Sequence, residues 1–328
     1  MPASTLPESA VSDPLLYLAP LPYSRRVYAY GFPVDIAGNA REVVDAAQES
    51  WGAYPARFDR PPVRIHVTAG EGRGPLPPSP VLRGQRHLLL WISDQENFAV
   101  IDRRQGFGFS SVSRTTLEDR TFFRWHFLDA LTYMLLELNY ITSIHAACVA
   151  WQGAGVLLYG PSGVGKSTLS YACARRGWTY ISDDSSSVLW GGGRDVIGEP
   201  HHFRFRAEAP DLFPELRGRT VGYQLDHKPT IEVLTADLPI QTAAQCEVAR
   251  LVFLNRVPAG GVHIRRIGAA EAFGRIRQDM PIFDPDLEAT RQAAVEAVTA
   301  VPAIELTYSN FEQAVTALDQ LVQPGAAA

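Results

Sequence analysis

Cysteine is scarce in this sequence: its 328 residues include only Cys148, Cys173 and Cys246, and no two of them form a C-x-x-C pair. Three such cysteines cannot build a disulfide framework or a zinc ribbon, and free thiols are typical of a reducing cytosol. No apolar run approaches the roughly 18 residues that a membrane helix requires. The first 22 residues carry prolines and acidic residues where a signal peptide would have a basic patch and an apolar stretch. We therefore expect a cytoplasmic protein without membrane contact.

The sequence also lacks an excess of basic residues. It has 30 Lys and Arg against 35 Asp and Glu, a net charge of −5 at pH 7. Proteins that bind nucleic acid usually show a basic excess, so no nucleic-acid partner is expected. Internal repeats and low-complexity tracts are absent as well. With 46% hydrophobic residues the chain can bury a substantial core, and its length predicts two domains.

The N-terminal part is predicted to be a loose tail followed by a small domain. Residues 1–22 are rich in Pro, Ser and Ala and form the tail. Residues 23–117 are expected to fold as a small α+β domain. Its predicted elements are strands within 26–36, 63–67, 87–92 and 98–101 and a helix over 40–51. Nothing in this segment indicates chemistry, so it could hold a substrate, cover a cleft or mediate oligomerisation.

The second predicted domain spans residues 118–328. It opens with an amphipathic helix, because apolar residues recur at helical spacing from Phe123 to Leu138. Strands are predicted over 143–151, 156–159, 178–184 and 304–308, and helices over 166–176, 269–278, 287–301 and 310–321. Glycine-rich stretches at 191–193 and 258–261 are expected to be hairpin turns. The alternation of strands and helices predicts an α/β fold.

One motif in this domain indicates nucleotide binding. Residues 160–167 read G-x-x-x-x-G-K-S, and they follow an apolar strand and precede a helix, as a phosphate-binding loop requires. Backbone N–H groups of such a loop converge on phosphate oxygens, and the helix dipole adds to the attraction. Lys166 is expected to reach the β- and γ-phosphates and the Ser167 hydroxyl to ligate magnesium. The predicted nucleotide-binding residues are Gly160, Pro161, Ser162, Gly163, Val164, Gly165, Lys166, Ser167 and Thr168.

Two acidic residues, Asp183 and Asp184, end the strand that follows the loop's helix. The helix climbs about 15 Å at helical rise. The strand descends about 17 Å, so Asp183 should return to the height of the phosphates. The pair could simply cap the strand exit, but its height favours a functional role.

His145 is the second feature near the predicted site. If residues 152–155 form a hairpin turn, His145 lies opposite Gly160 or Pro161, beside the loop. From this geometry alone a catalytic histidine and a satisfied core histidine are equally good interpretations. Arg204 and Arg206 alternate on one predicted strand and should face one way; they could be solvated or could hold phosphates.

These residues together resemble a family. Ile144-His145-Ala146-Ala147, the stretch from Gly155 to Ser167, Arg176-Gly177-Trp178 and Ser182-Asp183-Asp184 are similar to the catalytic domain of HPr kinase/phosphorylase, and more closely to shorter relatives such as lasso-peptide precursor kinases. The resemblance is specific over about 45 residues from His145. It implies a P-loop kinase core related to phosphoenolpyruvate carboxykinase, preceded here by the small α+β domain. Kinship with this family also implies a homo-oligomer.

The resemblance assigns roles residue by residue. Lys166 and Ser167 match the phosphate and magnesium positions, and Asp183 matches the acidic residue that takes the proton of the acceptor. Asp184 matches its neighbour near the metal, and His145 matches a histidine close to that pair. Thr168 stands where the bifunctional enzymes have glutamate, and their glycine-rich signature segment is not recognisable. These departures argue against dephosphorylation and against HPr itself as the substrate.

The function expected from the sequence is ATP- and Mg²⁺-dependent phosphorylation of a serine on a small protein or peptide, with a small-molecule hydroxyl as a lesser alternative. Asp183, His145 and Lys166 are the predicted catalytic residues, and Ser167 and Asp184 the predicted metal ligands. Two other hypotheses stay open: an ATP-binding regulatory or assembly module without phosphotransfer, and an ordinary ATPase or GTPase. The sequence does not name the acceptor.

Overall fold

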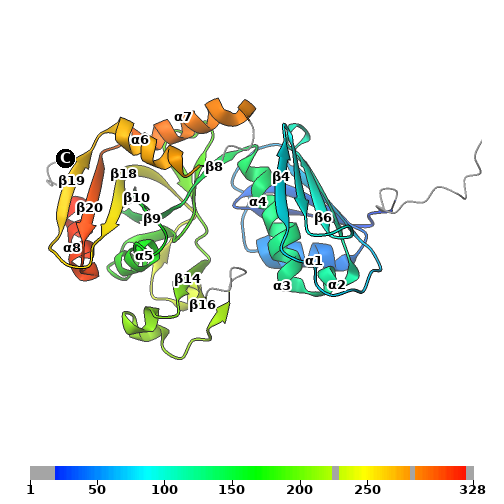
Figure 1. The fold of residues 1–328 in the computed structure, drawn as a ribbon, viewed down its shortest axis with the longest axis horizontal. Coiled ribbons are helices and arrows are strands. Elements are labelled where there is room, and N and C mark those ends of the chain that lie inside the picture. Colours follow the sequence, from blue (N-terminus) through cyan, green and yellow to red (C-terminus); the bar gives the residue numbers. More distant parts are fainter. Residues whose placement is uncertain (1–18, 224–228, 281–284, 323–328) are drawn as a thin grey trace, which may run out of the picture. The chain divides into compact units, whose positions relative to one another are not determined.

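The chain divides into two compact units, one ending at Asn139 and the other beginning at Tyr140 (Figure 1). A computed structural model describes residues 19–223, 229–280 and 285–322, and the predicted tail lies almost wholly outside them. The structural boundary lies later than the predicted start of the second domain at residue 118. Within the described residues, no helix has the length and apolarity needed to span a membrane.

The first unit is built on a seven-stranded mixed sheet in the order β1-β2-β3-β7-β6-β5-β4. Its centre is parallel, with β2 beside β3 and β3 beside β7, and the remaining pairs are antiparallel. The predicted strands are present, but β4 and β7 were not anticipated. The strands are β1 (Tyr23–Ala29), β2 (Phe32–Gly38), β3 (Val63–Ala69), β4 (Val81–Gln85), β5 (Leu88–Ile92), β6 (Phe98–Asp102) and β7 (Phe107–Val112).

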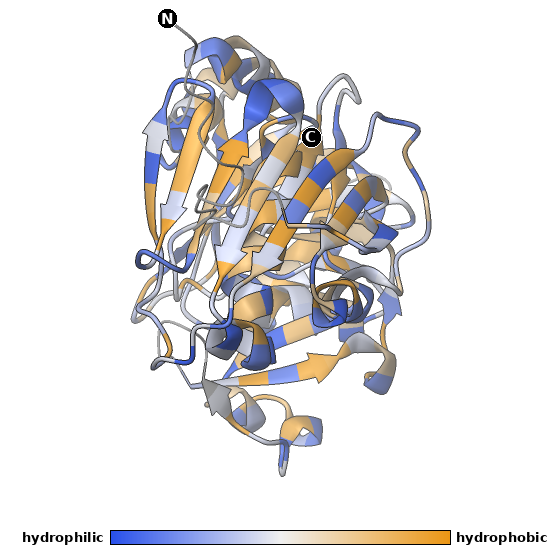
Figure 2. Ribbon diagram, turned by 90° about the vertical axis from the view of Figure 1, so that its right-hand side faces the viewer, coloured by the Kyte–Doolittle hydropathy of each residue, from blue (hydrophilic) through white to orange (hydrophobic). Residues whose placement is uncertain are grey.

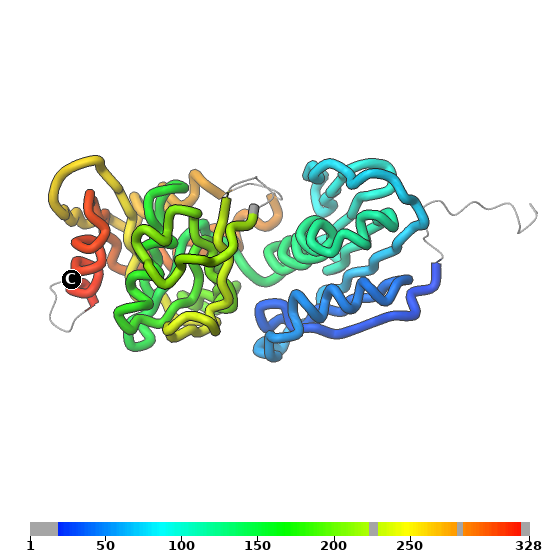
Figure 3. Tube along the Cα trace, turned by 90° about the horizontal axis from the view of Figure 1, so that it is seen from below, coloured from blue at the N-terminus to red at the C-terminus, as the bar shows by residue number. Residues whose placement is uncertain are grey.

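Helices cover one face of this sheet. Helix α1 (Arg41–Trp51) joins β2 to β3, and a helical segment after β7 runs alongside it (Figure 3). That segment comprises α2 (Arg114–Glu118), α3 (Arg120–Phe123), the π-helical turn η3 (Arg124–Asp129) and α4 (Ala130–Glu137). Gly108 of β7 lets it pack closely, because a Cβ there would lie 3.2 Å from Leu135 and 3.5 Å from Leu131. The amphipathic helix predicted to open the second domain therefore packs on the sheet of the first.

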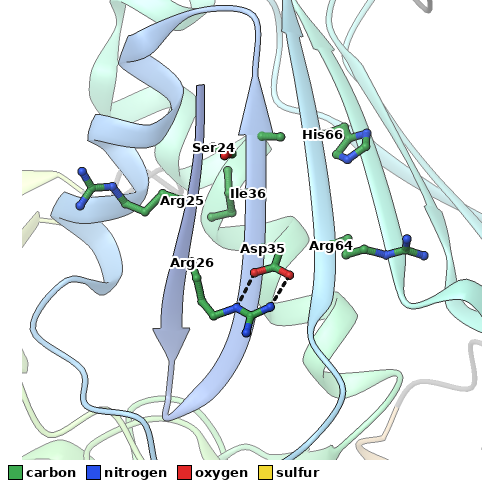
Figure 4. Close-up of a pocket in the computed structure, with 8 residues that line it drawn as sticks. Ser24, Arg25, Arg26, Asp35, Ile36, Arg64 and His66 are labelled. Atoms are coloured by element: carbon green, nitrogen blue, oxygen red, sulfur yellow. Dashed lines mark hydrogen bonds and ion pairs between the residues drawn. The ribbon is translucent and has the colours of Figure 1, made fainter. Parts of the chain in front are cut away.

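No helix covers the opposite face of this sheet within the described residues. Pairing places six half-buried apolar side chains on it, together with Val81 and Ile92, which are 57% and 38% exposed. Residues of β1, β2 and β3 line a pocket at the other end of the strand order. In this pocket Arg26 donates two hydrogen bonds to Asp35, at 2.6 and 2.7 Å (Figure 4). The six half-buried residues are Leu88, Leu90, Phe98, Val100, Phe107 and Phe109.

The second unit is built on a ten-stranded sheet whose main path runs β17-β11-β9-β10-β18-β13-β12-β8, with β20 beside β18 and β19 beside β20. β9 lies between β10 and β11 and is antiparallel to both, so these two strands point the same way. The strands are β8 (Ile141–Ile144), β9 (Ala146–Trp151), β10 (Ala154–Tyr159), β11 (Thr179–Ser182), β12 (Ser186–Leu189), β13 (Asp195–Ile197), β17 (Gln241–Thr242), β18 (Gln245–Arg256), β19 (His263–Ile267) and β20 (Ala303–Tyr308).

Two apolar cores lie on the two faces of this sheet. Helices α5 (Lys166–Arg175) and α8 (Phe311–Val322) pack on one face, and α6 (Ala269–Gln278) and α7 (Glu288–Thr299) on the other (Figure 1). Successive strand residues alternate between the cores: Leu158 faces α5, whereas Leu157 and Tyr159 face the other side. The strands accordingly carry long hydrophobic stretches, because both faces of the sheet are buried. Figure 2 colours the hydrophobic residues of the molecule orange, and many of them lie on strands.

A separate three-stranded antiparallel sheet, β14-β16-β15, packs against the α5 side of the core. It consists of β14 (His202–Arg206), β15 (Gly222–Tyr223) and β16 (Pro229–Leu234). Phe203 and Phe205 of β14 are buried, and Tyr171 of α5 meets both rings edge-on, at 5.3 and 4.9 Å between centroids. This aromatic contact holds β14 beside the helix that follows the predicted phosphate loop.

One predicted hairpin is wrong. The turn at residues 258–261 joins β18 to β19, but β19 pairs with β20, which itself pairs with β18. The strand from the end of the chain therefore inserts between them. By contrast, the turn at residues 191–193 does join the paired strands β12 and β13, as predicted.

Candidate active site

The predicted phosphate loop, residues 160–167, lies between the end of β10 and the start of α5. Gly163 and Gly165 have φ angles of +85° and +107°, a backbone region that favours glycine. A Cβ at Gly165 would lie 2.6 Å from the hydroxyl of Tyr308. That hydroxyl donates a hydrogen bond to the carbonyl of Val164, so the last residue of β20 supports the loop backbone. The loop is thus an open cradle at a helix N-terminus, the arrangement that binds phosphate.

Lys166 is buried although it carries the charge of the site. Its Nζ lies 2.8 Å from the carbonyl oxygen of Gly160, 3.4 Å from that of Pro161 and 2.9 Å from Nε2 of His145. Burial lowers the pKa of Lys166, and the carboxylates of Asp184 and Asp279 partly oppose this. The ammonium group is therefore held at the start of the loop. The negative charge of an incoming phosphate would there offset the cost of its lost hydration.

His145 lies at the break between β8 and β9. Ala146 pairs with Tyr159, so the next residue back is opposite Gly160, as the sequence predicted. The imidazole bridges two groups: Nε2 contacts Lys166, and Nδ1 lies 3.4 Å from a carboxylate oxygen of Asp184. Of the two interpretations of this residue, the structure favours a site histidine, since its side chain is half exposed.

Asp183 follows β11 and is buried, with only 7% of its surface exposed. Its side chain accepts a hydrogen bond from the backbone N–H of Arg204 at 3.0 Å, and its carbonyl accepts one from the Ser167 hydroxyl at 3.4 Å. Burial raises the pKa of Asp183 to about 6, although the Arg204 N–H and guanidinium partly oppose the shift. A carboxylate with this pKa is ionised at neutral pH and is basic enough to accept a proton.

The donor set at this site fits magnesium bound together with phosphates. Ser167 and Asp184 offer a hydroxyl and a largely exposed carboxylate, which are the hard oxygen donors that Mg²⁺ prefers. Within the described residues, no group of three His, Cys, Asp or Glu side chains is arranged to hold a metal. Such a sparse set suits Mg²⁺, which usually takes one or two carboxylates and completes its shell with phosphate and water. Thr168 lies in the first turn of α5 and is half-buried.

Three residues near the loop were not predicted to belong to the site. The Tyr159 hydroxyl, at the end of β10, donates a hydrogen bond to the carboxylate of Asp279, which follows α6, and burial raises its pKa. Tyr308 supports the loop from β20, and burial raises its pKa to about 12. No local pattern identifies these residues, because they come from distant elements; only the position of Tyr159, directly before the motif, was a possible signal.

Comparison with known proteins matches the segment that holds the phosphate loop, His145 and the Asp183-Asp184 pair. Residues 137–206 match the model of the HPr Serine kinase C-terminal domain. The HPr kinase/phosphorylase of Lactobacillus acidophilus is 40% identical over 67 residues, which cover 20% of this chain and 21% of that protein. That of Shouchella clausii is 38% identical over 91 residues, 28% of this chain and 26% of the relative. The matches thus span about a fifth to a quarter of each relative.

A solved structure, the Hpr(Ser) kinase/phosphatase from Coxiella burnetii, aligns with 55% of this chain and 91% of that one, at 15% identity. The TM-score of this alignment is 0.27.

Proposed function

Because residues 137–206 belong to the HPr kinase-like family, we propose that this protein is a kinase that transfers the γ-phosphoryl group of ATP to a serine hydroxyl. The proposed acceptor is a serine on a small protein or peptide, with a small-molecule hydroxyl as the lesser alternative. The proposed setting is the cytoplasm, where the three free thiols would stay reduced.

One observation carries this proposal: Asp183, whose buried carboxylate has a raised pKa, contacts the phosphate-loop residue Ser167 through its backbone carbonyl. The carboxylate of the same residue is held by the backbone N–H of Arg204 on β14, beside the loop helix. A loop that only binds nucleotide has no need of such a base, whereas hydrolysis could use the same carboxylate to activate water. The match of residues 137–206 to a serine kinase domain is what favours transfer to a hydroxyl.

The proposed reaction is an in-line transfer. The serine oxygen forms a bond to the γ-phosphorus, and the bond from that phosphorus to the bridging oxygen breaks, leaving its electron pair on ADP. The serine proton passes to the carboxylate of Asp183. Lys166 and the loop N–H groups neutralise charge on the transferring group. His145 orients Lys166 and Asp184 through the contacts of its two ring nitrogens.

Magnesium would be held by Ser167 and Asp184 and would supply charge neutralisation at the phosphates. The residues of the chain do the remainder: the loop binds, Lys166 positions and Asp183 accepts the proton. The two pockets described in the first unit share no residue with this site.

Incubation of the protein with γ-labelled ATP, Mg²⁺ and a pool of serine-containing peptides tests the proposal. We expect label in phosphoserine, which acid hydrolysis and mass spectrometry identify. Release of labelled inorganic phosphate alone would indicate an ATPase instead. Nucleotide binding without turnover in any arm would support the alternative function, an ATP-binding regulatory or assembly module.

A further inference from the structure

Arg206 ends strand β14 and reaches toward the phosphate loop. Along β14 the aromatic side chains of Phe203 and Phe205 point into the core, so Arg204 and Arg206 lie on the opposite face, as the alternation predicted. Arg206 is exposed, and its Nη2 donates a hydrogen bond to the hydroxyl of Ser162 at 3.3 Å. The guanidinium of Arg206, from a separate sheet, therefore contacts Ser162 of the loop.

The two arginines of this strand differ in their electrostatic partners. Arg204 has two carboxylates nearby, Glu199 at 3.5 Å and Glu232 at 3.6 Å. For Arg206, no carboxylate lies within ion-pair distance among the residues that the structure describes. A guanidinium without a carboxylate, placed beside a loop built to bind anions, is free to bind a phosphate as a bidentate donor.

We infer that Arg206 is a catalytic residue that binds the γ-phosphoryl group of ATP; this inference rests on the proposed kinase function. Lys166 already contacts the carbonyls of Gly160 and Pro161, and Arg206 contacts the next residue, Ser162. Two cations thus meet the first three residues of the loop from different elements. Together they would neutralise the group that moves.

The position of Arg206 also couples it to the proposed base. The backbone N–H of Arg204 holds the carboxylate of Asp183, and Arg206 follows two residues later on the same strand. As the serine oxygen bonds to the γ-phosphorus and the bridging oxygen leaves with ADP, Asp183 takes the serine proton. Arg206 meanwhile pairs with the equatorial oxygens of the phosphoryl group, as arginines do in other phosphoryl-transfer sites.

Nucleotide titrations test this inference without the unidentified acceptor. Isothermal titration calorimetry would measure the affinity of each protein for two ligands. They are Mg-ADP and the Mg complex of the ATP analogue that has an imido bridge between the β- and γ-phosphates. The proteins are the parent, Arg206→Gln, Arg206→Lys and the control Arg194→Gln. Arg194 is a matched control because it is a partly exposed arginine paired with Glu247, which neighbours the start of β10, the strand end away from the loop.

We expect Arg206→Gln to weaken binding of the analogue about 10- to 100-fold and to leave ADP affinity within about threefold, because a charge-assisted contact to the γ-phosphate is lost. Arg206→Lys should lose less, since it keeps the charge without the planar fork. Arg194→Gln should match the parent.

Equal losses for both nucleotides would overturn the inference, because Arg206 would then only support the loop. So would parent-like affinity of Arg206→Gln for both. A parent protein that binds neither nucleotide would instead overturn the proposed function itself, and the inference with it.

Discussion

The backbone N–H of Arg204 donates to the carboxylate of Asp183 at 3.0 Å, and this bond fastens β14 to the end of β11. The carboxylate is therefore held by a strand that belongs to a different sheet. Because burial raises the pKa of Asp183 to about 6 while the Arg204 N–H favours the ionised form, the group stays ionised at neutral pH without losing its basicity.

Replacement of the proposed base should separate binding from transfer. We expect Asp183→Asn to keep ATP affinity within a few-fold and to reduce phosphoryl transfer by a factor of about 10² to 10⁴, the usual contribution of general-base catalysis. Since only the ionised carboxylate accepts a proton, transfer by the parent should rise with pH through about 6. Transfer rates at saturating ATP between pH 5 and 8 measure both effects, with Asp195→Asn as a remote carboxylate control. A variant that transfers at the parent rate would move the base elsewhere, first to Asp184.

The same carboxylate should make stability depend on pH. Its pKa is about 6 in the folded protein and near 3.8 when unfolded, so between these values the folded state binds more protons. Stability therefore falls as pH rises through this window. Asp183→Asn mimics the protonated form, and its stability relative to the parent should increase by about 1.4 kcal/mol from pH 5 to pH 8. Urea unfolding of both proteins at the two pH values measures this. A constant difference would contradict the burial of an ionised carboxylate.

His145 should matter less than Asp183, because it contacts Lys166 and Asp184 and not the transferred proton. We expect His145→Ala to reduce transfer by less than the factor of about 10² at which Asp183→Asn begins, and to raise the KM for ATP. His145→Gln, which can still hydrogen-bond Lys166, should recover part of the loss. Steady-state kinetics at several ATP concentrations distinguish these variants. A loss as large as that of Asp183→Asn, with no change in KM, would instead make His145 the proton acceptor.

The parts of this fold that the sequence predicts well are those with local signals. The motif at 160–167 lies between a strand and a helix as expected, and α5 ends before Gly177, whose φ of +91° is the predicted left-handed stop. The predicted helix over residues 269–278 has the same bounds as α6. Each of these depends on periodicity, capping or glycine within a short window.

The misses are non-local. Nothing in residues 118–139 tells which sheet their apolar stripe covers, and the small sheet β14-β16-β15 depends on contacts between distant segments. The same holds within the site. The hairpin register placed His145 beside the loop, but it does not say which aspartate the ring meets. The buried Asp183 carboxylate bonds the backbone of β14, and Asp184 takes the contact with His145. Side-chain direction at a strand exit cannot be read from spacing alone.

Loss of the loop lysine should abolish nucleotide turnover and spare the fold. Lys166 is desolvated and satisfied by carbonyls and His145, so its charge is costly to bury without phosphate. We expect Lys166→Ala to unfold within a few degrees of the parent and to show no measurable ATP consumption. Thermal unfolding and a coupled ADP assay test the two parts separately. Near-normal ATP consumption would mean that residues 160–167 are not the nucleotide site.

Nucleotide binding should reside in the second unit alone, and the place of truncation should matter. All site residues from His145 to Tyr308 follow Tyr140, whereas α4 packs on the first unit's sheet near Gly108. A protein beginning at residue 118 would therefore expose apolar side chains such as Leu131 and Leu135, and exposed patches of this kind promote aggregation. We expect a protein beginning at Tyr140 to be monodisperse in size-exclusion chromatography with light scattering and to bind Mg-ADP as the full chain does. The longer truncation should elute in aggregates. If instead only the longer one binds ADP, residues 118–139 belong functionally with the phosphate loop, as the sequence had suggested.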